Sequence, residues 1–181
     1  MKKRTTQLLL ILAIGVLFNS CGKKESDVAP EVGSQMNYTG KSYNLSQGYA
    51  DVTTIDKLTY VSLYLFTSSL KITEKNNEID SFSGLATGLA LQLILPKNTE
   101  GLSAGEYIYD GREDKVNTFS DGAIVLDFDI NEDEGFLKEI KAGKITVRKT
   151  GDIYEISFDM KDTDGKAITG NYKGKLKIYK Y

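Results

Sequence analysis

The stretch from Gly143 to Tyr179 reads GKITVRKTGDIYEISFDMKDTDGKAITGNYKGKLKIY, and its alternation of apolar and polar residues decides the fold class. In its middle part the apolar side chains occupy every second position: Tyr154, Ile156, Phe158 and Met160. The positions between them are polar: Glu155, Ser157 and Asp159. Because successive side chains of a β-strand point to opposite faces, this pattern predicts a strand with one buried face and one solvated face.

Two turn signals divide this stretch into three strands. Thr150-Gly151-Asp152 ends the first strand, and Asp162-Thr163-Asp164-Gly165 ends the second with the Asp-Gly pair that permits a positive φ. We therefore expect a three-stranded antiparallel meander. Its third strand should turn one file of residues inward: Ile168, Gly170, Tyr172, Gly174, Leu176 and Ile178. Glu155 and Asp159 are expected to lie opposite a file of lysines: Lys173, Lys175 and Lys177.

Upstream of the meander, three segments carry weaker signals. The segment from Ala123 to Ile130 alternates, with one face expected to hold Ile124, Leu126, Phe128 and Ile130. Residues 131–142 place Phe136, Leu137 and Ile140 at helical spacing, which predicts a helical turn. Residues 83–95 fit a strand or a buried helix, and Gly84, Gly88 and Pro96 favour the strand.

The first half of the domain is rich in β-branched and aromatic residues. Residues 57–73 form the longest such run, which is too long for one strand with one solvated face and is expected to bend near residues 67–69. Residues 38–45 are expected to form the first strand. Together these patterns predict one all-β domain, residues 38–181, folded as a single antiparallel β-sandwich of about eight to ten strands, with a lipocalin-like closed β-barrel as the alternative.

The first 20 residues have the pattern of an export signal. Met1 to Arg4 is cationic, and Leu8 to Phe18 is an unbroken apolar run, LLLILAIGVLF. This run is shorter than the roughly 20 apolar residues that cross a bilayer. The one cysteine of the chain, Cys21, stands where cleavage is expected.

This segment resembles a bacterial lipoprotein signal peptide, with Ser20 as the small residue before the cysteine and Phe18 where the pattern prefers leucine. The resemblance implies that residues 1–20 are removed and that Cys21 carries lipid, which anchors the protein to the membrane without a transmembrane helix. It further implies an outer-membrane location, and the charged residues 23–27 are compatible with surface display. Residues 21–37 are expected to be a tether. The alternative to lipidation is a plain secreted protein whose cysteine lies near the cleavage site by chance.

A second resemblance concerns the domain itself. Residues 143–179 are similar to the closing hairpins of lipoproteins from gut-dwelling Gram-negative anaerobes. The segment Gly101-Leu102-Ser103-Ala104-Gly105-Glu106-Tyr107 resembles the glycine-then-tyrosine entry into a strand that recurs in the same lipoproteins. The shared features are hairpin signals, so this resemblance transfers no functional residue to the chain.

The composition excludes several classes of function. The 181 residues include no histidine, which rules out histidine triads, histidine general bases and imidazole-bound zinc or copper. Without the three basic residues of the signal, 20 basic and 25 acidic side chains remain, a net charge of about −5. A nucleic-acid surface needs clustered basic residues, and the sequence has no such cluster. We expect no cofactor, no metal and no nucleic-acid partner.

Acidic patterns are weak candidates for chemistry. Residues 127–135 carry oxygen ligands at alternate positions, but a calcium loop needs glycine at the sixth position and a carboxylate at the twelfth. Counted from Asp127, these positions hold Glu132 and Lys138. A carboxylate pair could serve a glycoside hydrolase, yet 25 acids provide such pairs by chance. No nucleophile, phosphate-loop or redox motif occurs, and we expect the protein not to be an enzyme.

The tyrosines are the stronger indication of function. Five of the eleven crowd the first half of the domain: Tyr38, Tyr43, Tyr49, Tyr60 and Tyr64. Tyrosine joins a rigid apolar ring to a hydroxyl, which suits binding surfaces, and the alternative is that these rings line the core. We predict a lipid-anchored, non-catalytic binding or adhesion module for a glycan, a peptide or another envelope protein. A lipocalin-like carrier of a small apolar ligand is the alternative, and a carboxylate-based glycoside hydrolase is a third hypothesis.

Overall fold

The computed structural model describes residues 33–75 and 78–180, and in this part of the chain every regular element is a strand. The predicted all-β class is therefore confirmed. The twelve strands are β1 (Gln35–Tyr38), β2 (Lys41–Asn44), β3 (Gln47–Ile55), β4 (Leu58–Phe66), β5 (Leu70–Lys75), β6 (Glu78–Pro96), β7 (Gly105–Tyr109), β8 (Thr118–Asp129), β9 (Glu134–Thr150), β10 (Ile153–Asp162), β11 (Ala167–Gly174) and β12 (Lys177–Lys180).

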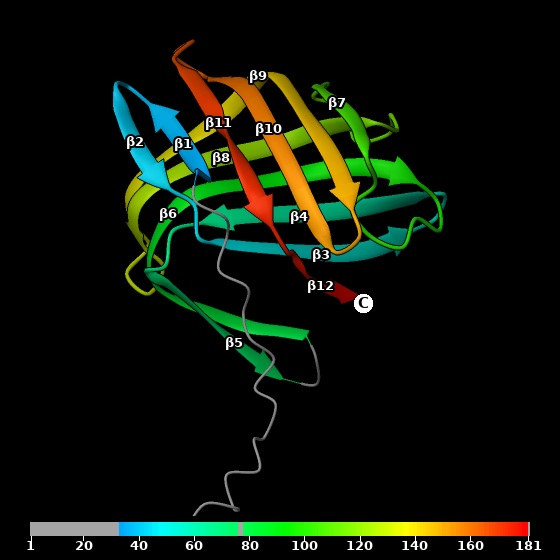
Figure 1. The fold of residues 1–181 in the computed structure, drawn as a ribbon, viewed down its shortest axis with the longest axis horizontal. Coiled ribbons are helices and arrows are strands. Elements are labelled where there is room, and N and C mark those ends of the chain that lie inside the picture. Colours follow the sequence, from blue (N-terminus) through cyan, green and yellow to red (C-terminus); the bar gives the residue numbers. More distant parts are fainter. Residues whose placement is uncertain (1–32, 76–77, 181) are drawn as a thin grey trace, which may run out of the picture.

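Eleven of these strands form one strongly curled, open sheet (Figure 1). Their order is β12-β3-β4-β6-β8-β7-β9-β10-β11-β1-β2, so that β12 and β2 are the two edges, and β5 pairs with β6 beside this path. Two pairings are parallel, β12 with β3 and β7 with β8, and the others are antiparallel. The curl brings β9, β10 and β11 across β3 and β4.

The core lies inside the curl. Strands from both ends of the sheet alternate between buried and more exposed residues, as the burial along β4 and β10 shows. Their buried side chains meet in one apolar cluster, which includes fully buried residues from opposite arms of the curl: Val61, Leu63 and Leu65 with Ile145, Ile156 and Met160. Large rings occupy the interior as well, among them Tyr107, Phe119 and Tyr172.

The predicted meander is confirmed as β9, β10 and β11. Gly165 has a φ of +77°, as the Asp-Gly turn requires. Glu155 lies opposite Lys173, and their charged groups are 3.2 Å apart. Asp159, in contrast, lies opposite Thr169 and Lys144 rather than opposite one of the three late lysines.

The structure has more strands than the expected eight to ten. The expected first strand, residues 38–45, ends at once in a turn at Thr39 and Gly40, both with positive φ, and the chain forms two short strands around it. β1 begins at Gln35, inside the segment expected to be a tether, because Met36 is fully buried in the core. The end of the chain adds β12, which leaves the meander and pairs with β3.

Two other expectations are wrong. Residues 131–142 form no helical turn, because β9 begins at Glu134 and pairs with β8.

The expected common face of β8 is divided by a bulge at Asp127, whose φ is +47°. Leu126 packs on the main core, whereas Phe128 joins a second, smaller cluster on the outer side of the sheet. The extra residue of the bulge turns the following side chains to the other face.

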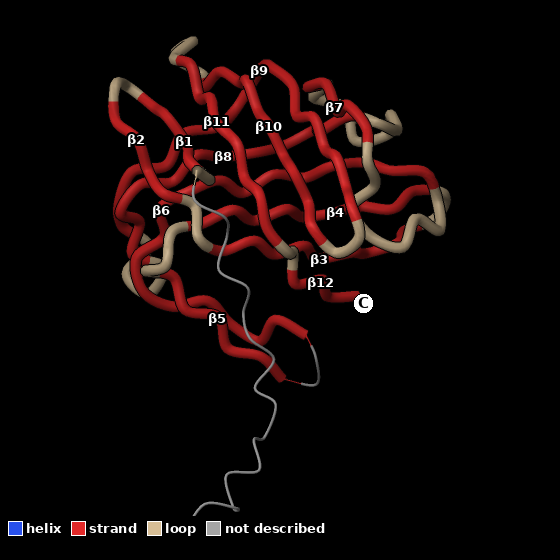
Figure 2. The backbone as a smooth tube through the Cα atoms, viewed as in Figure 1, coloured by secondary structure: helices blue, strands red, loops and turns tan. Residues whose placement is uncertain are grey.

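The run of residues 57–73 bends where expected, since β4 ends at Phe66 and β5 begins at Leu70. Residues 83–95 belong to a strand, β6, which bends at Gly84 and Gly88. The first part of β6, residues 78–84, pairs with β5 as a hairpin that projects from the sheet (Figure 2). We call this hairpin the arm.

The expected signal peptide, residues 1–20, the lipidation site Cys21 and most of the expected tether lie outside the described residues. Among the described residues, no helix has the length and apolar character needed to cross a membrane.

Candidate functional site

The structure separates the five tyrosines that the sequence singled out. Tyr38 is buried in the main core, and Tyr43 packs against it. Tyr49, Tyr60 and Tyr64 are half-buried on the opposite, outer side of the sheet. Three of the five therefore form a candidate surface, and two have a structural role.

Strand register brings these three side chains together. On β3 the outward positions are Tyr49, Asp51 and Thr53, since Ala50 and Val52 between them are buried in the core. Their partners on β4 are, in the same order, Tyr64, Ser62 and Tyr60. Directly opposite side chains on one face lie close enough to contact the same ligand. We call these six residues the tyrosine face.

Other parts of the chain border the tyrosine face at both ends. At one end the arm packs on it, with the rings of Tyr64 and Phe82 5.6 Å apart. At the other end the Tyr60 hydroxyl donates a hydrogen bond of 3.1 Å to the carbonyl of Glu113, in the loop before β8. Both contacts fix the orientation of a tyrosine ring, which reduces the entropy lost when a ligand binds.

The arm is also tied to the edge strand of the sheet. The carboxylate of Glu74 on β5 accepts hydrogen bonds from Lys177, at 2.6 Å, and from the hydroxyl of Tyr179, at 2.8 Å. The hydrogen bonds from Lys177 and Tyr179 lower the pKa of Glu74. Tyr179 is the register partner of Asp51, so the arm is fastened one strand away from the centre of the tyrosine face.

Two oxygen atoms on the outer side of β3 are buried without a hydrogen-bond partner in the described part of the chain. They are Oδ1 of Asp51 and Oε1 of Gln47. The amide nitrogen of Gln47 donates to the carbonyl of Leu70, which leaves only its oxygen unused. Burial raises the pKa of Asp51. A buried acceptor without a donor costs folding free energy. Both side chains are only half-buried as a whole, so a ligand's hydroxyl or amide would contact their accessible part.

The tyrosine face thus combines aromatic rings, hydroxyls and an acid, and the side-chain amides of Gln47 and Gln92 lie beside it. The row through its centre runs across the strands as Asp51, Ser62 and Gln92. Such a row offers both donors and acceptors beside apolar rings, and this combination suits a polar ligand that also has apolar faces. The next outward acid along the row is Asp121, opposite Gln92. It lies three strands from Asp51, roughly 14 Å away, which is farther apart than the carboxylates of a glycoside hydrolase.

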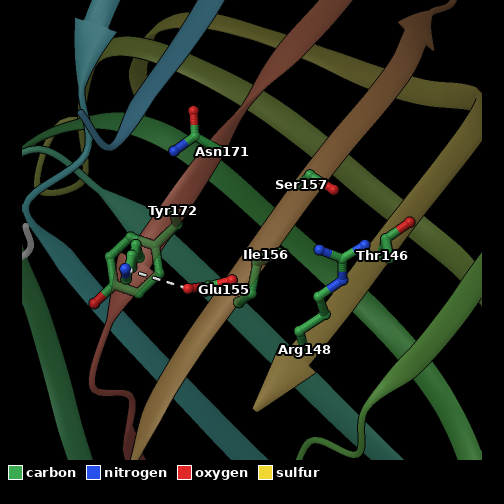
Figure 3. A pocket seen from close by; sticks show the side chains of 8 residues that line it. Thr146, Arg148, Glu155, Ile156, Ser157, Asn171 and Tyr172 are labelled. Carbon is green, nitrogen blue, oxygen red and sulfur yellow. Dashed lines mark ion pairs between the residues drawn. The ribbon is translucent and has the colours of Figure 1, made fainter. Parts of the chain in front are cut away.

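A depression of about 350 Å³ on the outer side of β9, β10 and β11 is the other candidate (Figure 3). Its centre holds short polar side chains in one cross-strand row, Thr146, Ser157 and Asn171. The ion pair of Glu155 with Lys173 crosses it, and Tyr172 in its wall is buried in the core. It therefore offers no aromatic ring to a ligand, and its polar row is the ordinary solvated face of an antiparallel sheet.

Sequence reasoning identified the tyrosines but missed Asp51 and Gln47. The available signal was the alternation of Tyr49, Asp51 and Thr53 before the two-residue turn Asp56-Lys57, which fixes the register with β4. Comparisons of the chain with protein-family models, with curated proteins and with solved structures find no match. The geometry of the tyrosine face is therefore the feature that points to a function.

Proposed function

We propose that the protein is a non-catalytic binding module, held at the outer membrane by lipid on Cys21, and that it binds a saccharide chain on the tyrosine face. The observation that carries this proposal is the placement of three half-buried tyrosines, in register, around a carboxylate with a buried and unused oxygen. Sugar rings present apolar C–H faces and many hydroxyls, so they complement both kinds of group.

The filled interior supports a surface binder over a carrier. Buried side chains from both arms of the curl pack in one cluster, where a carrier needs a cavity lined by inward residues. For the same reason we propose that the curled sheet is a sandwich-like fold with two packed layers and not a hollow barrel.

Nothing in the geometry favours hydrolysis. Burial raises the pKa of Asp51, as a general acid needs, but hydrolysis also needs a second, unpaired carboxylate about 5–10 Å away. Glu74 is held in hydrogen bonds by Lys177 and Tyr179, and Asp121 is three strands away. We therefore assign binding, and not bond cleavage, to this surface.

A glycan array followed by calorimetry on the best ligand tests the proposal. Tyr49→Ala and Tyr60→Ala should each weaken binding by about fivefold or more, since stacking on one ring is worth on the order of 1 kcal/mol or more. Thr146→Ala and Ser157→Ala, in the depression on the outer side of β9, β10 and β11, are the matched controls and should leave the affinity unchanged. The absence of any glycan ligand, or a loss confined to the control variants, would contradict the proposal.

A further inference from the structure

The tyrosine face continues into a depression of about 550 Å³ at the tip of the β3–β4 hairpin. The residues that line it are Ile55, Asp56, Lys57, Leu58, Tyr60 and Lys97. Tyr60 belongs to both surfaces, so a ligand that covers its ring reaches the depression. The ring is held in place by the hydrogen bond from its hydroxyl to the carbonyl of Glu113.

Two lysines, Lys57 and Lys97, line this depression, and neither forms an ion pair in the described part of the chain. Leu58 lies opposite Pro96 across β4 and β6, so Lys57 and Lys97 each stand one residue beyond the same pair. Both are exposed, and in residues 33–75 and 78–180 neither has a carboxylate within 4.0 Å. Asp56 lines the depression as well but pairs with neither. Like charges on neighbouring strands repel, and an anionic group between them would remove this cost.

In the neighbouring loop, by contrast, the cationic side chains have an acidic partner within the fold. There, Arg112 and Lys115 both bind the carboxylate of Asp110, at 2.8 Å and 2.9 Å. These hydrogen bonds hold the pKa of Asp110 far below its usual value. Lys57 and Lys97 have no such partner, which distinguishes the tip depression from the charged loop beside it.

The depression is also partly apolar. Ile55 is 55% exposed, and Leu58 and Tyr60 add apolar surface beside it. A small inorganic anion would leave this surface in contact with water. A ligand that carries both an anionic group and C–H faces would cover it and would contact the lysines at the same time.

We propose that the ligand of the tyrosine face is an acidic saccharide, an oligouronide, and that one of its carboxylates binds between Lys57 and Lys97. This inference rests on the proposed function and names its ligand class. From Asp51 to Ile55 the strand runs four residues, roughly 14 Å at about 3.4 Å each, which is the length of a short oligosaccharide. The ligand's hydroxyls then reach Asp51 and Ser62 while its sugar ring covers Tyr60.

The test compares oligouronides with their neutral methyl esters. The full chain with Cys21→Ser is titrated with oligomers of galacturonic, glucuronic and mannuronic acid, each in the free-acid and the methyl-ester form. We expect at least one acid to bind about tenfold or more tightly than its ester, with a preference that weakens as salt is added. The double variant Lys57→Gln/Lys97→Gln should lose this preference and keep the affinity for the ester. Lys71→Gln/Lys161→Gln, which changes two other exposed lysines, is the control.

The possible results separate the inference from the proposed function. Equal affinity for every acid and its ester, or a preference that survives in the double variant, would overturn the inference and leave saccharide binding standing. Binding of neither form, together with an empty glycan array, would overturn both. Anionic phosphatidylglycerol vesicles form the last arm. Vesicle binding that needs Lys57 and Lys97, without any preference among saccharides, would assign the depression to a lipid surface and overturn the inference.

Discussion

The hydroxyl of Tyr38 donates a hydrogen bond of 2.7 Å to Oδ2 of Asp162, 124 residues later in the chain. Each residue is 3% exposed. Oδ1 of the same carboxylate accepts hydrogen bonds from the backbone amides of Asp164 and Lys166, at 2.9 Å and 2.8 Å. Burial alone would raise the pKa of Asp162, but the hydrogen bonds from Tyr38 and the two amides outweigh it, and the pKa is lowered. This contact fastens β1 to the turn between β10 and β11.

Removing the Tyr38 hydroxyl should therefore destabilise the fold. Tyr38→Phe leaves a buried carboxylate with one acceptor unused, and we expect the free energy of unfolding at neutral pH to fall by about 1–3 kcal/mol. Urea unfolding measures this loss. Tyr60→Phe, whose hydroxyl bonds to an exposed loop, is the matched control and should change stability by no more than about 0.5 kcal/mol. Equal losses in the two variants would contradict the assignment.

The pH dependence of the same variant follows from two shifts. Because the pKa of Asp162 is lowered below 3.8 on folding, its stabilisation is present above that value and is lost as the pH falls through the folded pKa. Burial and the bond to Asp162 raise the pKa of Tyr38, so its contribution is complete below pH 10.0 and declines above it. The difference in stability between the native protein and Tyr38→Phe should therefore shrink in strong acid and in strong alkali.

The pKa of Asp51 shifts in the opposite direction to that of Asp162, so the pH dependence of its contribution to stability should be reversed. Burial raises its pKa above 3.8, so the folded state holds the proton more tightly and its stability falls as the pH rises through the folded pKa. Asp51→Asn should be more stable than the native protein at neutral pH, by roughly 1 kcal/mol, while it loses affinity for the ligand. Below pH 3.8 the difference should vanish. Asp80→Asn, on the exposed side of the arm, should change stability little at any pH. A variant that is less stable at neutral pH would mean that Asp51 has a stabilising partner in the fold.

The parts of the fold that could be predicted are those that local sequence determines. The meander is readable because Tyr154 to Met160 alternates and because Gly151 and Gly165 mark its turns. The divided face of β8 is not readable, since nothing in the alternation of residues 123–130 signals a bulge at Asp127. The edge strand β12 depends on pairing with β3, more than 120 residues earlier, and no local pattern encodes that contact.

The candidate site also has a part that could be predicted from local sequence and a part that could not. The tyrosines could be chosen from the sequence by their number alone, but Tyr38 and Tyr49 look alike there, and only the register of the strands sends one to the core and the other outward. Oδ1 of Asp51 is buried without a hydrogen-bond partner in the described part of the chain, and burial of this kind arises only from tertiary contacts.

The bend in β6 should depend on Gly88. Its φ is +153°, and a Cβ atom there would overlap the backbone carbonyl of Leu65 and the ring of Phe66. Since strain and steric overlap add, Gly88→Ala should lower the free energy of unfolding by more than about 3 kcal/mol. Gly165→Ala is the control, because its φ is +77° but the space around it is open, and we expect a loss of about 1 kcal/mol. Similar losses of unfolding free energy for Gly88→Ala and Gly165→Ala, measured by urea unfolding, would show that the close approach of β4 does not require glycine at position 88.

The anchoring prediction concerns Cys21, which precedes the described residues. If its thiol carries lipid, the native protein should stay in the membrane fraction through a high-salt wash, because each buried methylene contributes about 0.8 kcal/mol and salt does not weaken this term. Cys21→Ser should move the protein to the soluble fraction and abolish labelling by an alkyne fatty acid, while Ser26→Ala, five residues away, should behave as the native protein does. The domain has no other cysteine to accept lipid, so the variant tests the anchor without redundancy. Membrane retention of Cys21→Ser equal to that of the native protein would show that lipid on this residue does not hold the domain at the envelope.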